Sequence, residues 1–181
     1  MGLADTLTLP TNSTGAQPAA GSSRALVAFF TRSGNTKLIA SKVGRDLGAD
    51  LFEIEPVEPY SEDYEATVAQ AEREKQTGYE PPLKGGVGEI GAYSTVYLGF
   101  PIWGSTAPTV IKSFLSKHDL AGKDLVPLIT HGGYGAGDSL AVLRRMAPKA
   151  RLCRPLIIRM DQERAILREV TNWLQASGAR K

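Results

Sequence analysis

The sequence predicts a three-layer, doubly wound α/β protein, in which helices cover both faces of a five-stranded parallel sheet. Two observations predict this fold class. Short apolar runs alternate with amphipathic segments from Ala25 onward, which is the pattern of repeated strand–helix–strand units. The first run, ALVAFF at 25–30, is apolar at every position, as expected of a strand that is covered on both faces. The length of 181 residues fits a single domain.

The first amphipathic segment follows the strand at 25–30 after a polar turn. Ile39, Val43 and Leu47 recur four residues apart and therefore share one face of a helix, which Gly48 is placed to end. A short second strand is expected over 51–54.

A second, more polar helix is expected to begin at Ser61. Glu62 and Asp63 would lie in its first turn, where acidic side chains interact favourably with the helix dipole. Its apolar face is thin and consists of Tyr64, Val68 and Ala71. The stretch 78–92 that follows is rich in glycine and proline, so we expect it to be a loop.

The third strand is expected over 95–100, and the helix after it combines a cap with a clear apolar stripe. Ser105 or Thr106 can cap this helix, and Pro108 is tolerated in its first turn. The stripe consists of Val110, Ile111, Phe114 and Leu115. These residues are expected to pack on the sheet.

Two further strands and two helices complete the pattern. The fourth strand, 125–130, contains Pro127, which has no N–H for a ladder, so we expect a bulge or a missing hydrogen bond there. The fifth strand is expected over 156–158. The core-facing residues of the helix between these strands are Leu140, Leu143 and Met146, and those of the last helix are Ile166, Val170, Trp173 and Leu174.

Composition excludes several classes of protein. Charged residues make up 22% of the chain and the net charge is only +2, so neither nucleic acid nor an anionic membrane is an expected partner. One cysteine, Cys153, and two histidines exclude an intramolecular disulfide and a cysteine- or histidine-rich metal site. No apolar run is long enough to cross a bilayer.

The two ends of the chain differ from the alternating region. Residues 1–23 are rich in Thr, Ser, Gly, Ala and Pro and have no secretory signal, so we expect a disordered leader and a cytoplasmic protein. We expect the folded domain to span 24–176 and a flexible tail to follow at 177–181.

The loop after the first strand is suited to bind a phosphate. Ligands of open parallel sheets bind at the carboxyl ends of the strands, and a helix start offers unpaired N–H groups to an anion. Thr31, Ser33 and Thr36 add hydroxyl groups, and Gly34 allows the backbone to approach closely. A simple capping turn is the alternative interpretation. Neither GxxxxGK[ST] nor GxGxxG occurs here, which argues against a P-loop or a dinucleotide site.

The loops after the third and fourth strands carry aromatic residues among glycines. Trp103 lies between Pro101 and Gly104, where its indole could stack on a planar ligand or fold back on the core. The stretch 131–137 contains four glycines and Tyr134, so it could either approach a ligand or form a flexible loop.

These loops resemble those of the flavodoxin family. TRSGNT at 31–36 is similar to the family's FMN phosphate loop, Trp103–Gly104 to the Trp-Gly pair of its second flavin loop, and the glycines around Tyr134 to the third. The resemblance covers about 24–176 and implies the strand order 2-1-3-4-5. It implies an FMN site formed by Thr31, Arg32, Ser33, Gly34, Asn35, Thr36, Pro101, Ile102, Trp103, Gly104, Thr130, His131, Gly132, Gly133, Tyr134 and Gly135.

The resemblance implies a redox protein that transfers electrons through FMN to a partner protein or a small-molecule acceptor. It also implies that the peptide after Trp103, at Gly104, can reorient when the flavin gains a proton. No catalytic side chain and no metal are expected, because the cofactor carries the chemistry. Ser105 stands where many flavodoxins have an acidic residue, and the pI of 8.7 contrasts with the acidic carriers.

Two other functions remain open at this point. An NAD(P)H-dependent reductase of quinones or similar acceptors is the first, and a binding module without a flavin is the second. The expected oligomeric state is a monomer or a weak homodimer.

Overall fold

The computed structural model describes residues 24–160 and 163–179. The leader expected at 1–23, the residues 161–162 and the last two residues of the expected tail lie outside the described residues, as do the side chains of 163–166.

Strands and helices alternate along the described chain, as the sequence predicts. The strands are β1 (Arg24–Phe29), β2 (Asp50–Glu53), β3 (Tyr93–Pro101), β4 (Asp124–His131), β5 (Arg151–Leu152) and β6 (Leu156–Arg159). The helices are α1 (Asn35–Leu47), α2 (Tyr64–Thr77), α3 (Thr109–Lys117), α4 (Ser139–Met146) and α5 (Glu163–Ser177), and a 3₁₀ turn covers Ile90–Ala92.

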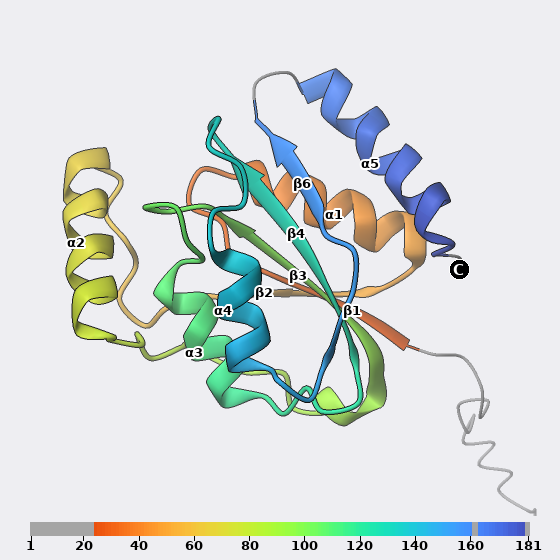
Figure 1. Cartoon of the computed structure of the whole chain (residues 1–181), viewed down its shortest axis with the longest axis horizontal. Coiled ribbons are helices and arrows are strands. Elements are labelled where there is room, and N and C mark those ends of the chain that lie inside the picture. Colours follow the sequence, from red (N-terminus) through yellow and green to blue (C-terminus); the bar gives the residue numbers. More distant parts are fainter. Residues whose placement is uncertain (1–23, 161–162, 180–181) are drawn as a thin grey trace, which may run out of the picture.

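The strands form one parallel sheet in the order β2-β1-β3-β4-β5, with β6 paired to β4 beyond β5. The predicted order is therefore confirmed, with one addition: the last strand is divided into two pieces. Figure 1 shows α1 and α5 on one face of the sheet and α3 and α4 on the other. This is the three-layer architecture that the alternation predicts.

Pro127 lies opposite the point at which the last strand is divided. β4 pairs with β5 at Asp124 and Leu125 and with β6 only from Leu128 onward. The backbone carbonyl of Leu125 points toward β5, since it accepts from Cys153 N at 2.8 Å. The backbone groups of alternate residues point toward the same neighbouring strand, so those of Pro127 point to this side as well. The absent N–H of Pro127 thus falls in the gap between β5 and β6. The register with β3 continues through Pro127, so the missing hydrogen bond is confirmed and the bulge is not.

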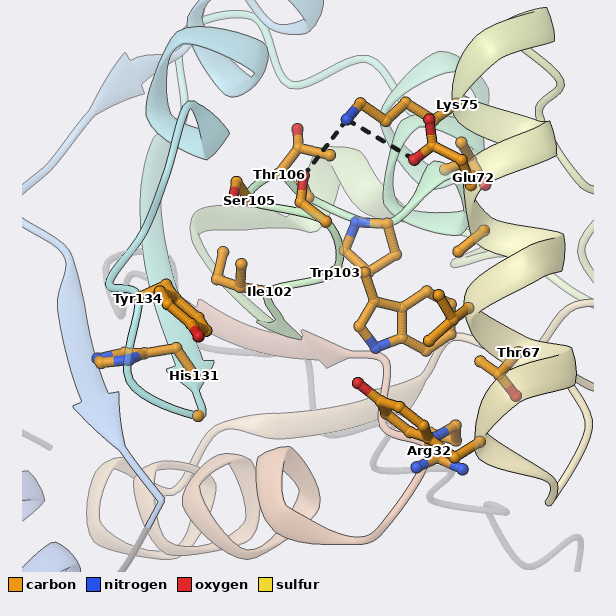
Figure 2. Close-up of a pocket in the computed structure, with 18 of the residues that line it drawn as sticks. Arg32, Thr67, Glu72, Lys75, Ile102, Trp103, Ser105, Thr106, His131 and Tyr134 are labelled. Carbon is orange, nitrogen blue, oxygen red and sulfur yellow. Dashed lines mark hydrogen bonds and ion pairs between the residues drawn. The ribbon is translucent and has the colours of Figure 1, made fainter.

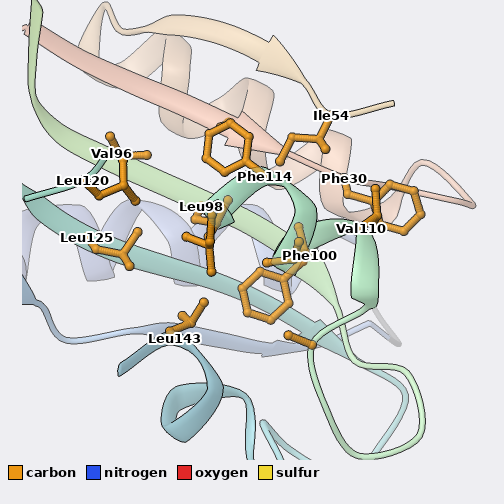
Figure 3. Packing of buried hydrophobic residues seen from close by; sticks show 14 of the residues in the cluster. Phe30, Ile54, Val96, Leu98, Phe100, Val110, Phe114, Leu120, Leu125 and Leu143 are labelled. Atoms are coloured by element: carbon orange, nitrogen blue, oxygen red, sulfur yellow. The ribbon is translucent and has the colours of Figure 1, made fainter. Parts of the chain in front are cut away.

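Two apolar clusters, one on each face of the sheet, form the core. Alternation along β1 sends Leu26 and Ala28 to one cluster and Val27 and Phe29 to the other. The first cluster packs under α3 and α4, and Figure 3 shows its centre, where Phe114, Val110 and Leu143 meet Leu98 and Phe100 of β3. The second cluster includes Ile39 and Val43 of α1 and Val170, Trp173 and Leu174 of α5, as predicted. The side chain of Ile166 lies outside the described residues.

The start and the packing of α2 differ from the sequence prediction. The helix begins at Tyr64 rather than Ser61, because the Asp63 carboxylate accepts from Ala66 N at 2.7 Å and caps it. Tyr64 and Val68 are 64% and 45% exposed, so the thin apolar stripe does not face the core. In Figure 1, α2 lies beside the sheet rather than on it.

The start of α3 also differs. The helix begins at Thr109, directly after Pro108, and the prediction of a cap at Ser105 or Thr106 is wrong because these residues belong to a separate turn. The stretch 78–92 is mostly irregular, as expected, although Leu83 forms a bridge with Pro56 and the 3₁₀ turn closes the stretch.

A buried histidine connects α3 to this irregular stretch. The His118 Nε2 accepts from Val87 N at 2.9 Å, while Nδ1 bonds the Phe114 carbonyl oxygen at 2.8 Å. The imidazole is 7% exposed, and this burial lowers the pKa of His118. The neutral ring with its proton on Nδ1 satisfies both partners.

Candidate functional site

Three loops meet at one edge of the sheet. They follow β1, β3 and β4, which are neighbours in the sheet, and parallel strands place their carboxyl ends at the same edge. The winding direction reverses at β1 and β3, so a ligand site is expected there.

The first loop presents backbone amides at the start of α1. Gly34 precedes the helix with φ 88, and its N–H donates to Thr31 Oγ1 at 3.0 Å. The amides of Ser33, Asn35 and Thr36 find no acceptor within the part of the chain that the structure describes. These free N–H groups and the positive end of the helix dipole favour an oxyanion.

Thr36 and Thr130 are buried together behind this loop. Their hydroxyl oxygens lie 2.9 Å apart, and the side chains belong to residues that are 1% and 2% exposed. The structure thus joins the first turn of α1 to the end of β4. One hydroxyl donates to the other, so the backbone amide of Thr36 and the hydrogen of the accepting hydroxyl remain for a ligand.

The second loop closes in a tight turn. Trp103 and Thr106 exchange two backbone hydrogen bonds, both 3.0 Å long, and the two residues between them, Gly104 and Ser105, have φ values of 52° and 64°. Positive φ at both central residues is the mark of a type I′ turn. Glycine adopts this conformation easily, whereas Ser105 is strained by it.

The Trp103 indole is half-buried in a cluster of aromatic rings. Its ring centroid lies 4.8 Å from that of Tyr60 and 5.3 Å from that of Phe30, both edge to face. Phe30 directly follows β1, so this cluster connects the first two loops. The sequence left open whether the indole stacks on a ligand or folds back on the core. In the structure it packs against Tyr60 and Phe30 and also lines a cavity, so the two interpretations are compatible.

The third loop is organised around His131. The Nδ1 atom of this residue accepts from Gly133 N at 3.0 Å and from Gly135 N at 3.1 Å, which requires the Nε2–H tautomer. Tyr134, at the tip, is 92% exposed. A single side chain thus shapes the glycine-rich loop.

Gly137 brings the third loop against the second. A Cβ atom on Gly137 would lie 1.8 Å from the Ser105 carbonyl oxygen, and the N–H of Asp138 donates to that same oxygen at 3.0 Å. Only glycine permits this approach. The relative position of the two loops therefore depends on this contact.

A cavity of about 500 Å³ lies between these loops and α2. Figure 2 shows Trp103 in its middle, His131 and Tyr134 on one side and α2 on the other. The predicted site residues that line it are Arg32, Ile102, Trp103, Gly104, His131, Gly132 and Tyr134. The remaining predicted residues, Thr31, Ser33, Gly34, Asn35, Thr36, Pro101, Thr130, Gly133 and Gly135, do not line this cavity; Thr31 lines a second one of about 430 Å³ together with Arg32.

Comparison with known proteins identifies the family. A model of the flavodoxin family matches residues 24–177. The chain belongs to the flavodoxin family. A search of curated proteins finds no significant match.

Solved structures agree with this assignment. A candidate flavoprotein from Bacteroides eggerthii is 32% identical, with a TM-score of 0.72 over 86% of this chain and 98% of the other. One from Bacteroides uniformis is 25% identical, with a TM-score of 0.75 over 86% and 99% of the two chains. A Lactobacillus acidophilus flavoprotein in complex with FMN has the same fold at 19% identity, with a TM-score of 0.68 over 81% and 99%.

Helix α2 forms part of the cavity wall, which the sequence did not predict. The residues that α2 contributes are Tyr64, Thr67, Val68, Ala71, Glu72 and Lys75. The thin apolar stripe of the helix was the available signal, because Tyr64, Val68 and Ala71 face the cavity instead of the core. Lys75 Nζ donates to the Gly104 carbonyl oxygen at 3.4 Å and lies 3.9 Å from the Glu72 carboxylate.

Arg32 and Lys112 complete the cavity wall. Arg32 Nη1 donates to the Glu62 carbonyl oxygen at 3.3 Å, and its guanidinium lies 5.9 Å from the centre of the Tyr64 ring. Lys112, on α3, has no partner among the described side chains. The wall therefore carries more positive than negative charge.

The residues present fit a flavin mononucleotide. Free amides and a helix dipole suit its phosphate, the Trp103 indole in the cavity wall suits its planar ring, and glycine loops allow close approach to polar atoms. Within the described residues no cluster of histidine, cysteine and acidic side chains could hold a metal ion. No described helix has the length and hydropathy to span a bilayer.

Proposed function

We propose that this flavodoxin binds FMN at the carboxyl edge of its sheet and transfers electrons through it. The observation that carries the proposal is that two features lie at that edge: unpaired amides at the start of α1 and a cavity lined by the Trp103 indole. A mononucleotide with a phosphate monoester and a planar ring requires both.

Each of the three loops would contact a different part of FMN. The amides of Ser33, Asn35 and Thr36 would hold the phosphate, Trp103 would lie against the ring, and the loop around Tyr134 would cover the ring's opposite side. FMN supplies the redox chemistry when bound, and the protein orients it and limits its contact with water. The FMN complex of the L. acidophilus flavoprotein supports this assignment by fold.

Titration of the purified protein with FMN and with riboflavin tests the proposal. Tight FMN binding with quenched flavin fluorescence is expected, and riboflavin, which lacks the phosphate, should bind at least about tenfold more weakly because charge-assisted hydrogen bonds are lost. Trp103→Ala should weaken the binding of both compounds. The absence of binding at micromolar FMN would overturn the proposal.

A second part of the proposal concerns the molecules that give electrons to the bound flavin and take them from it. We propose a redox partner protein or a small-molecule acceptor, a cytoplasmic location and a monomer or weak homodimer. The NAD(P)H-dependent reductase stays a prediction, and steady-state turnover of the FMN-loaded protein with NADPH and a quinone decides it. Negligible turnover would eliminate the reductase and leave electron transfer to a partner protein or to another small-molecule acceptor.

A further inference from the structure

A buried carboxylate lies behind the aromatic cluster of the site. Glu74 lies on helix α2, most of whose residues are not buried, yet it is only 6% exposed. A buried carboxylate is costly unless hydrogen bonds satisfy it. Three side chains do so here: the Tyr60 hydroxyl donates to Oε2 at 2.8 Å, Gln70 donates to Oε1 at 2.9 Å, and the Thr109 hydroxyl also donates to Oε2.

The hydroxyl of Tyr60 connects this carboxylate to the site. Burial is the main cause that raises the pKa of Tyr60, so the hydroxyl stays protonated and donates. The ring that carries it stands edge-on to Trp103, with an interplanar angle of 89° and the centroids 4.8 Å apart. Tyr60 also contacts Phe30, with centroids 5.6 Å apart.

Glu74 therefore fixes one end of Tyr60 while the ring supports the indole. The stretch that carries Tyr60 has no regular structure of its own, so its ring depends on such side-chain contacts for a defined position. Charge-assisted hydrogen bonds are stronger than those between neutral groups, and the bond from Tyr60 to Glu74 is partly buried, so water competes little for either group.

We propose that Glu74 is a positioning residue for the flavin site: its carboxylate holds Tyr60, and Tyr60 holds the Trp103 indole in the orientation that receives the flavin ring. The effect on the flavin rests on the proposed function, whereas the effect on the indole does not.

The variants Glu74→Gln, Tyr60→Phe and their combination test this inference. The chain has two tryptophans, so each variant is made with Trp173→Phe, which leaves Trp103 as the single indole. Three quantities are measured: the near-ultraviolet circular dichroism of Trp103, the FMN dissociation constant and the midpoint potential of bound FMN. Gln70→Met is the matched control, because it removes a donor from the other oxygen of the same carboxylate.

Both single variants should reduce the dichroism of Trp103 and raise the FMN dissociation constant about three- to tenfold. The double variant should bind FMN no more weakly than the worse of the two single variants, because both changes act on the same hydrogen bond: Glu74→Gln removes its charge and Tyr60→Phe removes its donor. Gln70→Met should lower thermal stability with little change in the three site measurements.

Two outcomes separate the hypotheses. If Glu74→Gln and Tyr60→Phe lower stability but leave the Trp103 signal and FMN affinity as in Gln70→Met, Glu74 has only a structural role and the inference is overturned. If the parent protein does not bind FMN, the proposed function fails, and the Trp103 signal alone still decides whether Glu74 positions the indole. Tyr60→Phe preserves the test if Glu74→Gln does not fold.

Discussion

The Lys75 ammonium donates a hydrogen bond to the Gly104 carbonyl oxygen at 3.4 Å, so helix α2 contacts the peptide that follows the indole. This carbonyl lies in a type I′ turn whose second central residue, Ser105, has φ 64. A side chain outside the three loops thus contributes to the conformation of the second loop.

Lys75→Met should make the midpoint potential of bound FMN about 20–40 mV more negative, because a cation is lost from the wall beside a group that gains negative charge on reduction. Stability should change by less than about 0.5 kcal/mol, since the ammonium is exposed. Lys117→Met is the control: Lys117 also donates to a glycine carbonyl, that of Gly85, but does not line the cavity. Equal potentials for the two variants would contradict the role of Lys75.

Gly137→Ala should be much more harmful than Gly135→Ala. Both glycines have positive φ, 54° and 71°, so alanine strains the backbone at either position by about 1 kcal/mol. Only at Gly137 does the new Cβ collide with the Ser105 carbonyl, which should raise the cost to about 2–4 kcal/mol and weaken FMN binding. Chemical denaturation and FMN titration measure the two effects. Similar losses in both variants would show that the contact between the loops is unimportant.

Thr36→Val and Thr130→Val should each destabilise the protein by about 1–3 kcal/mol, because each leaves the other hydroxyl buried without its partner. The double variant should lose less than the sum of the two, since no orphaned hydroxyl remains. Denaturant unfolding of the four proteins gives the coupling energy. Strict additivity would indicate that the two hydroxyls do not pair.

The free energy of unfolding should fall as the pH decreases below about 6.5. Burial lowers the pKa of His118 in the folded state from its ordinary 6.5, so the unfolded chain binds more protons below that pH. The stability that the neutral ring contributes is complete above pH 6.5 and is lost as the pH falls toward the lowered pKa. His118→Gln can keep one donor and one acceptor, so it should flatten this dependence. Unfolding at pH 5 and pH 8 measures it, and an unchanged slope in the variant would assign the dependence to other groups.

The fold could be predicted from the sequence because its signals are local. Six apolar positions in a row before a polar turn identify β1, and the four-residue spacing of Ile39 and Val43 identifies α1. The division of the last strand was only partly predictable. Pro127 indicated that β4 would lack one hydrogen bond, but not that the strand beside it would be interrupted at that point. The loops of the site were found because each follows a strand directly.

The contribution of α2 could not be predicted in the same way. Glu74 lies among other polar residues of α2, and nothing in the local pattern distinguishes this buried carboxylate from exposed ones on the same helix, such as Glu72. Its partners Tyr60 and Thr109 are 14 and 35 residues away in the sequence. Contacts of this kind depend on how the helix is placed beside the sheet, and periodicity does not encode that placement.

The divided last strand has a consequence for association between molecules. An exposed sheet edge is a template to which another chain can add a strand and so begin to aggregate. In this sheet one outer edge is β2, with four residues, and the other consists of β5 and β6, with two and four residues, interrupted opposite Pro127. No outer edge of the described sheet therefore offers a long run of free backbone groups, and the interruption opposite Pro127 shortens the edge that β5 and β6 would otherwise form.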